Sequence, residues 1–108
     1  MNWRERFDAE LEHAERARAR GNEGQARVCA RRAAGIAVAE YFRRRGHPAT
    51  SGSAIDVLDQ LALEPELPAE CASILTHLLQ KVNTEFKLPS GVDLIAEARL
   101  LRQQLLPD

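Results

Sequence analysis

The stretch QARVCARRAAGIAVAEYFRRR, residues 25–45, places the strongest constraint on how this chain can fold. On a helical wheel, one broad apolar face is formed by Ala26, Cys29, Ala30, Ala33, Ile36, Ala37 and Tyr41. A second apolar strip is formed by Val28, Val38, Ala39 and Phe42. Neighbouring elements must therefore cover this helix on more than one side, and its alanines let their backbones approach closely. The pattern predicts a helix in the middle of a bundle or in a subunit interface.

The remainder of the chain predicts further helices and a single domain, residues 1–108. Alanine, leucine, arginine and glutamate dominate the composition, and strand-forming residues are scarce. Apolar residues recur at helical spacing over residues 3–20, 53–62, 68–86 and 93–106. We therefore expect an all-α, up-and-down bundle of four to five helices.

Glycine and capping residues mark the ends of these helices. The link GNEG should end the first helix at Gly21 and let Asn22 cap the second, which makes the two an antiparallel hairpin. Gly46 should end the second helix, Ser53 should cap the third, and Ser90 with Asp93 should cap the last.

Three apolar stripes are expected to face the core from the later helices. The third helix offers Ile55, Leu58, Leu61 and Ala62. The fourth offers Cys71, Ile74, Leu75, Leu78, Leu79, Val82 and Phe86. The fifth offers Leu94, Ala98, Leu101 and Leu105, and it leaves Leu100 and Leu106 for a subunit contact.

Charge is distributed unevenly although the formal net charge is only −1. Residues 1–47 hold 11 arginines against 7 acidic residues, whereas residues 48–108 hold 4 basic against 9 acidic residues. One interpretation is that the two halves attract each other within the fold or across a dimer. The other is that the arginines form a surface for nucleic acid.

No pattern for metal, cofactor or catalytic chemistry stands out. Cys29 and Cys71 form no CxxC motif and suggest two reduced, buried thiols in a cytoplasmic protein. The three histidines lie at no metal-ligand spacing, and neither a phosphate-binding loop nor a nucleophile elbow is present. Nothing near the first residue resembles a signal peptide, and no apolar run is long enough for a membrane helix. We expect no metal, no cofactor and no membrane partner.

Arginine is the side chain best suited to gripping phosphate, so the arginine clusters provide the candidate ligand-binding residues. These are Arg27 and Arg31 on one side of the second helix, and Arg43, Arg45 and His47 at its end. No aromatic residue is interleaved with them in the sequence, so base stacking has no support there. The alternative interpretation is a solvated surface whose last arginines offset the helix dipole.

The order of these segments resembles the HEPN family of small helical domains. The resemblance rests on the link ARARGNEGQA, on the alanine-rich helix ARVCARRAAGIAVAEYFRRRGH that follows, and on the short helix AIDVLDQL after it. It implies a dimeric bundle of four to five helices. It also implies either a ribonuclease or a partner subunit, such as one that binds a nucleotidyltransferase.

The ribonuclease motif of that family, an arginine followed after four to six residues by histidine, is missing. Arg43 and His47 are separated by only three residues and lie too early in the chain. We therefore expect no catalytic residues and predict a dimeric, non-catalytic subunit that binds a protein or a nucleotide-like ligand. Two alternatives remain: a divergent RNA-processing enzyme using Arg43, Arg45 and His47, and a helical interaction module unrelated to HEPN.

Overall fold

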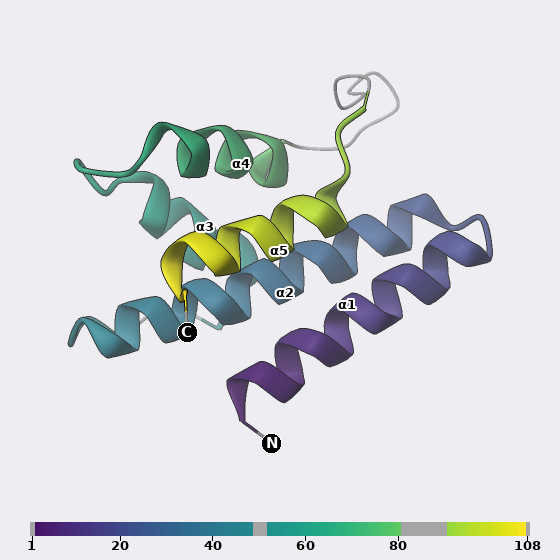
Figure 1. Ribbon diagram of the computed structural model, residues 1–108, viewed down its shortest axis with the longest axis horizontal. Helices are drawn as coiled ribbons and strands as arrows, with labels where there is room; N and C mark the ends of the chain where they lie inside the picture. The colour runs from purple at the N-terminus through teal and green to yellow at the C-terminus, as the bar shows by residue number, and fades with distance from the viewer. Residues whose placement is uncertain (1, 49–51, 81–90, 108) are drawn as a thin grey trace.

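The computed structural model describes residues 2–48, 52–80 and 91–107, and these form five α-helices and no strand. The helices are α1 (Trp3–Ala19), α2 (Glu23–Arg44), α3 (Ala54–Ala62), α4 (Ala69–Leu79) and α5 (Leu94–Leu105). The predicted all-α class is confirmed. Helices α1 and α2 form the expected antiparallel hairpin, and α2 packs against α1, α3 and α5 (Figure 1).

Apart from α4, the helices begin and end close to the residues that the caps predict. Helix α4 ends at Leu79, earlier than the predicted residue 86, because Gln80 already has an extended backbone with a ψ of 122°. Gly21 adopts a φ of +80° after α1, a conformation that glycine takes without steric cost. Asn22 Oδ1 then accepts a hydrogen bond from the backbone N–H of Gln25, at 3.1 Å. Ser53 caps α3 and Asp93 caps α5 through their side-chain oxygens. Ser90, its expected partner in a capping box, lies outside the described residues.

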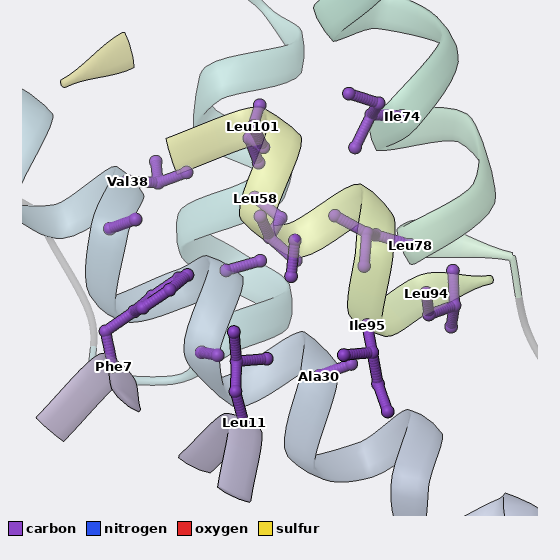
Figure 2. Packing of buried hydrophobic residues seen from close by; sticks show 14 of the residues in the cluster. Phe7, Leu11, Ala30, Val38, Leu58, Ile74, Leu78, Leu94, Ile95 and Leu101 are labelled. Atoms are coloured by element: carbon purple, nitrogen blue, oxygen red, sulfur yellow. The ribbon is translucent and has the colours of Figure 1, made fainter. Parts of the chain in front are cut away.

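All five helices contribute to one core (Figure 2). Phe7 and Leu11 reach it from α1, and α3, α4 and α5 supply leucines and isoleucines. Helix α2 contributes mainly alanines, and Ala30, Ala33, Ala34 and Ala37 are completely inaccessible to solvent. Small side chains thus let three neighbours pack closely on the same helix. Cys29 and Cys71 are free and buried, as the sequence predicts.

Three predicted core positions are wrong. Ile55 and Ala62 are exposed, whereas Val57 is buried beside Leu58 and Leu61. The reason is that Ala54, at the start of α3, packs on α2 and fixes which stripe of α3 faces inward. Leu106 is also buried rather than exposed, because the chain leaves the helical conformation there with a φ of −134° and turns back onto the core. Val82 and Phe86 lie outside the described residues.

Ion pairs join the two oppositely charged halves of the chain. Arg18 Nη1 donates to Asp93 Oδ1 at 3.0 Å, and the same guanidinium makes two hydrogen bonds to Glu23. Arg18 therefore connects the end of α1 to the first residues of both α2 and α5. This pair supports the interpretation that the two halves attract each other within the fold.

Glu40 is an acidic residue that α2 buries near its end. Its Oε1 accepts from Arg43 Nε at 2.8 Å, and its Oε2 accepts from Arg43 Nη2 and Arg44 Nε at 2.7 and 2.8 Å. Hydrogen bonds from Arg43 and then Arg44 outweigh the effect of burial and lower the pKa of Glu40 to about 2. The carboxylate is thus ionised and its hydrogen-bonding capacity is used within one helix.

The low pKa makes this cluster sensitive to acid. Because the carboxyl of an unfolded chain titrates near 4.5, Glu40 stabilises the fold above that pH and loses its contribution as the pH falls toward about 2. We expect Glu40→Gln to lower the free energy of unfolding by about 1 kcal/mol at neutral pH, since the arginines are largely solvated. The difference in free energy of unfolding between the wild type and Glu40→Gln should become smaller when urea unfolding is measured at lower pH. Glu12→Gln, an exposed control, should show no such dependence.

Gly35 is required where α3 crosses α2. A Cβ atom on Gly35 would lie 2.9 Å from Ala54 Cβ and 3.0 Å from Ala54 Cα, so the start of α3 would have to move. Gly24 in the same helix has open space, with its nearest neighbour at 3.9 Å.

These two glycines form a matched pair for a stability measurement. Gly24→Ala should stabilise the protein by up to about 1 kcal/mol, because alanine is the better helix former. Gly35→Ala should instead destabilise it by about 1–2 kcal/mol, because the steric overlap exceeds that gain. Urea unfolding measures both variants. Equal stabilisation by both would show that α3 does not approach α2 this closely.

Candidate binding groove along α2

One side of α2 is left open by its three neighbours and forms the floor of a groove of about 1320 Å³. Helix α1 supplies one wall through Arg6 and Glu10, and α3 supplies another around Ala54 and Ile55. The end of α4 closes the groove at Leu79 and Gln80. From α2 itself the lining residues are Gly24, Arg27, Val28, Arg31, Arg32, Gly35, Ile36 and Ala39. We call this feature the α2 groove.

The floor of the α2 groove is apolar. Val28 and Ile55 are 38% and 43% exposed, and Ile36 and Ala39 are partly buried beside them. The second apolar strip predicted on this helix is therefore divided: Val38 and Phe42 lie in the core, whereas Val28 and Ala39 face the groove. An apolar floor of this kind is typical of surfaces that a partner covers.

Arginines outnumber acidic residues in the lining. Arg6, Arg27, Arg31 and Arg32 contribute four positive charges, against Glu10 and Asp59. Within residues 2–48, 52–80 and 91–107, the side chains of Arg6 and Arg32 form no hydrogen bond or ion pair. Arg27 Nε is buried without a hydrogen-bond partner in the same ranges, and the nearest carboxylate oxygen, on Glu23, is 4.0 Å away. Arg27 thus keeps an ion pair with Glu23 but has an unsatisfied Nε, and within the described ranges the fold leaves the Arg6 and Arg32 guanidiniums without a partner.

Arg31 is different, because its guanidinium holds the end of α4. Its Nε donates to the carbonyl oxygen of Leu78 at 2.7 Å, and its Nη2 donates to that of Gln80 at 3.3 Å. The last carbonyls of a helix have no partner within the helix and carry a partial negative charge, so a buried cation satisfies them. Burial, together with the nearby charge of Arg27, lowers the pKa of Arg31. Of the two arginines predicted to bind ligand here, Arg31 thus also has a structural role.

The other predicted site residues lie at the far end of α2. Arg43 pairs with Glu40, Arg45 lies over the ring of Tyr41 at 5.1 Å, and His47 is exposed beyond the helix end. Sixteen helical residues separate Arg27 from Arg43, which corresponds to about 24 Å along the axis. The structure therefore does not bring the five predicted residues into one site. Two of them line the α2 groove, and three do not.

Few groups of the kind that hold metals or transfer protons lie near the α2 groove. Among the described residues no group of three or more His, Cys, Asp and Glu side chains could hold a metal ion. Two histidine–carboxylate pairs are present among the described residues. His77 Nδ1 lies 2.6 Å from Glu97 Oε1 and joins α4 to α5 away from the groove, whereas His13 Nδ1 lies 3.8 Å from Oε1 of Glu10, which lines the groove. Sequence reasoning overlooked Arg6 and Arg32, although Arg32 follows Val28 by one helical turn and so shares its face.

Comparison of the chain with protein-family models, curated proteins and solved structures finds no match. Within the part of the chain that the structure describes, no helix has the length and apolar character needed to cross a bilayer.

The structural role of Arg31 can be separated from that of its neighbour. Arg31→Met should lower the free energy of unfolding by about 1–3 kcal/mol, because two carbonyls at the end of α4 lose a charged donor. Arg32→Met makes the same substitution at an exposed position, so its free energy of unfolding should stay within about 0.5 kcal/mol of that of the wild type. Urea unfolding followed by circular dichroism measures both. Equal effects would contradict the assignment of Arg31 to the α4 end.

Proposed function

We propose that this protein is a non-catalytic binding subunit that uses the α2 groove to engage a protein, and that the simplest partner is a second copy of itself. One observation carries the proposal: α2 is covered by α1, α3 and α5, but its side bearing Val28, Ile36 and Ala39 is left open. The α2 residues that line the groove run from Gly24 to Ala39, which corresponds to a contact about 23 Å long. Such a length suits a helix-to-helix interface.

The charges of the α2 groove favour self-association. A two-fold interface pairs the same patch from each copy, so a patch that holds both signs of charge can complement itself. Arg27 and Arg32 lie on the α2 side of the groove, whereas Glu10 and Asp59 come from α1 and α3. An antiparallel pair of α2 helices would allow the arginines of each copy to face the acidic residues of the other. The apolar floor between them would supply most of the binding free energy.

The HEPN resemblance adds two further expectations to this proposal. The antiparallel α1–α2 hairpin, the short α3 and the two following helices occur in the order that the resemblance implies. A HEPN-like subunit would be dimeric and could bind a second protein, such as a nucleotidyltransferase, or a nucleotide-like ligand held by Arg27 and Arg32. The helix order supports this family assignment, which stays a proposal.

The divergent RNA-processing enzyme is a weaker candidate. Arg43 is hydrogen-bonded to Glu40, and His47 lies on the surface outside the α2 groove. A ribonuclease assay on the wild type and on His47→Ala tests it, because activity that depends on His47 would replace the binding-subunit proposal.

Sedimentation equilibrium tests the groove as a self-association surface. We expect a dimer at about 200 µM chain, and we expect Val28→Glu combined with Ile55→Glu to give a monomer, because like charges and lost apolar contact weaken association by well over tenfold. Both side chains are substantially exposed, so the substitutions should leave the fold intact. Leu63→Glu is the control, since Leu63 is 83% exposed and outside the groove lining.

Two results would contradict the proposal in different ways. A wild-type monomer at this concentration would exclude the second copy as the partner and leave a different protein. That protein can be sought by co-purification with wild-type bait and with the Val28→Glu, Ile55→Glu bait. Equal recovery of every co-purified protein by the two baits would show that the α2 groove binds none of them.

A further inference from the structure

A separate group of arginines surrounds Trp3 at one end of the bundle. Helix α1 begins at this end, and α2 and α5 both end there, on the left-hand side of Figure 1. The guanidinium carbons of Arg4, Arg44 and Arg102 lie 5.4, 5.7 and 5.2 Å from the centre of the Trp3 ring. Three helices thus each contribute one arginine to the same aromatic side chain.

A second aromatic residue extends this group along the last turns of α2. Arg45 lies over the Tyr41 ring at 5.1 Å, and on the helical wheel Tyr41 falls between Arg44 and Arg45. Both Trp3 and Tyr41 are partly exposed, and Arg43 is exposed beside Arg44 in the last turn of α2. We call this feature the Trp3 surface, and its residues are Trp3, Arg4, Tyr41, Arg43, Arg44, Arg45 and Arg102.

Positive charge dominates the Trp3 surface although the chain as a whole carries a net charge of −1. Its five arginines are accompanied by Glu40, whose carboxylate is buried and bonded to two of them. Asp8 and Glu12 border it where Arg102 lines a shallow hollow between α1 and α5, and Glu5 is exposed in the first turn of α1. Arginines therefore outnumber the acidic residues at this end of the molecule.

Stabilisation of the fold alone does not account for this arrangement. One arginine over a tryptophan contributes about 0.5–1 kcal/mol at an exposed site, but gathering several like charges around one ring costs part of that gain. A bound polyanion removes the cost, because each guanidinium can donate to an oxyanion while its plane still contacts the ring. Guanidiniums interleaved with partly exposed aromatic rings are the combination that binds unpaired nucleotides.

We propose that the Trp3 surface binds single-stranded nucleic acid. The arginines contact the phosphates, and the exposed parts of the Trp3 and Tyr41 rings contact bases. A single strand fits better than a duplex, because a duplex hides the faces of its bases and these rings lie at the ends of helices rather than on an element that could enter a groove. The α2 groove takes no part in this contact, so the two proposals stand or fall separately.

Trp3 is the only tryptophan of the chain, which makes its fluorescence a direct report on this surface. The experiment titrates the wild type with oligouridylate and oligothymidylate of about 12 nucleotides at about 50 mM salt, where phosphate contacts are strong. We expect the strand to quench Trp3 fluorescence, and we expect the anisotropy of a labelled strand to give the same dissociation constant. Raising the salt should weaken binding with a log–log slope of about −0.7 for each phosphate contact.

Matched variants locate the contact. Arg43→Gln with Arg45→Gln should weaken binding by about tenfold or more and reduce the salt slope by about 1.4, since two phosphate contacts are lost. Arg16→Gln with Arg20→Gln removes the same charge from exposed positions outside both surfaces and should change the affinity by less than about threefold. Tyr41→Leu should weaken binding with the salt slope unchanged, because it removes a ring and no charge. Circular dichroism checks that each variant is folded.

Several results would overturn the proposal. An unquenched Trp3 with no binding up to about 100 µM strand would exclude the site, because even non-specific nucleic-acid binding falls near this range. If the two double arginine variants lost the same amount of affinity for the strand, binding would reflect only the overall positive charge and not a site at Trp3. Inorganic polyphosphate that binds as tightly, with the same change in Trp3 fluorescence, would reduce the site to one for phosphate alone. A duplex of equal affinity would exclude preference for a single strand.

Discussion

The close approach of three helices to α2 is the interaction on which the rest of this structure depends. Five alanines of α2 are completely buried, and Gly35 lets the start of α3 come closer than any side chain would allow. Small residues bury less apolar area per side chain, but they bring neighbouring backbones together, so that larger residues such as Phe7 on α1 and Leu58 on α3 can pack in the same core around α2. The position of α3 is set at this crossing, and the position of α3 in turn forms one wall of the α2 groove.

The fold class and most helix ends could be predicted from the sequence because they depend on local signals. Asn22, Ser53 and Asp93 cap the helices that follow them, and Gly21 ends α1. The inward face of α3 could not be predicted, since Ile55 and Val57 are equally apolar. Only the contact of Ala54 with Gly35, between segments far apart in the chain, decides which of the two is buried.

The candidate sites were predicted less well, and the reason is again tertiary. Arginine content identified Arg27 and Arg31, but only the packed structure shows that Arg31 is bonded to α4 carbonyls and that Arg6 and Arg32 are not similarly engaged. Tyr41 precedes Arg45 by one helical turn, a spacing that the sequence prediction overlooked, and folding also brings Trp3, from the opposite end of the hairpin sequence, next to Arg44. A surface formed by residues from several helices is difficult to predict, because those residues have no characteristic spacing in the sequence.

The bond from Arg31 to the end of α4 also limits how this protein can evolve. A single side chain serves both as part of the groove lining and as the partner of two helix-terminal carbonyls. Substitutions that change the charge of the groove should therefore have little effect on the stability of the fold at Arg27 and Arg32. The same substitutions at Arg31 should destabilise it. Related chains that bind different partners should vary first at the two permissive positions and keep a cation at the third.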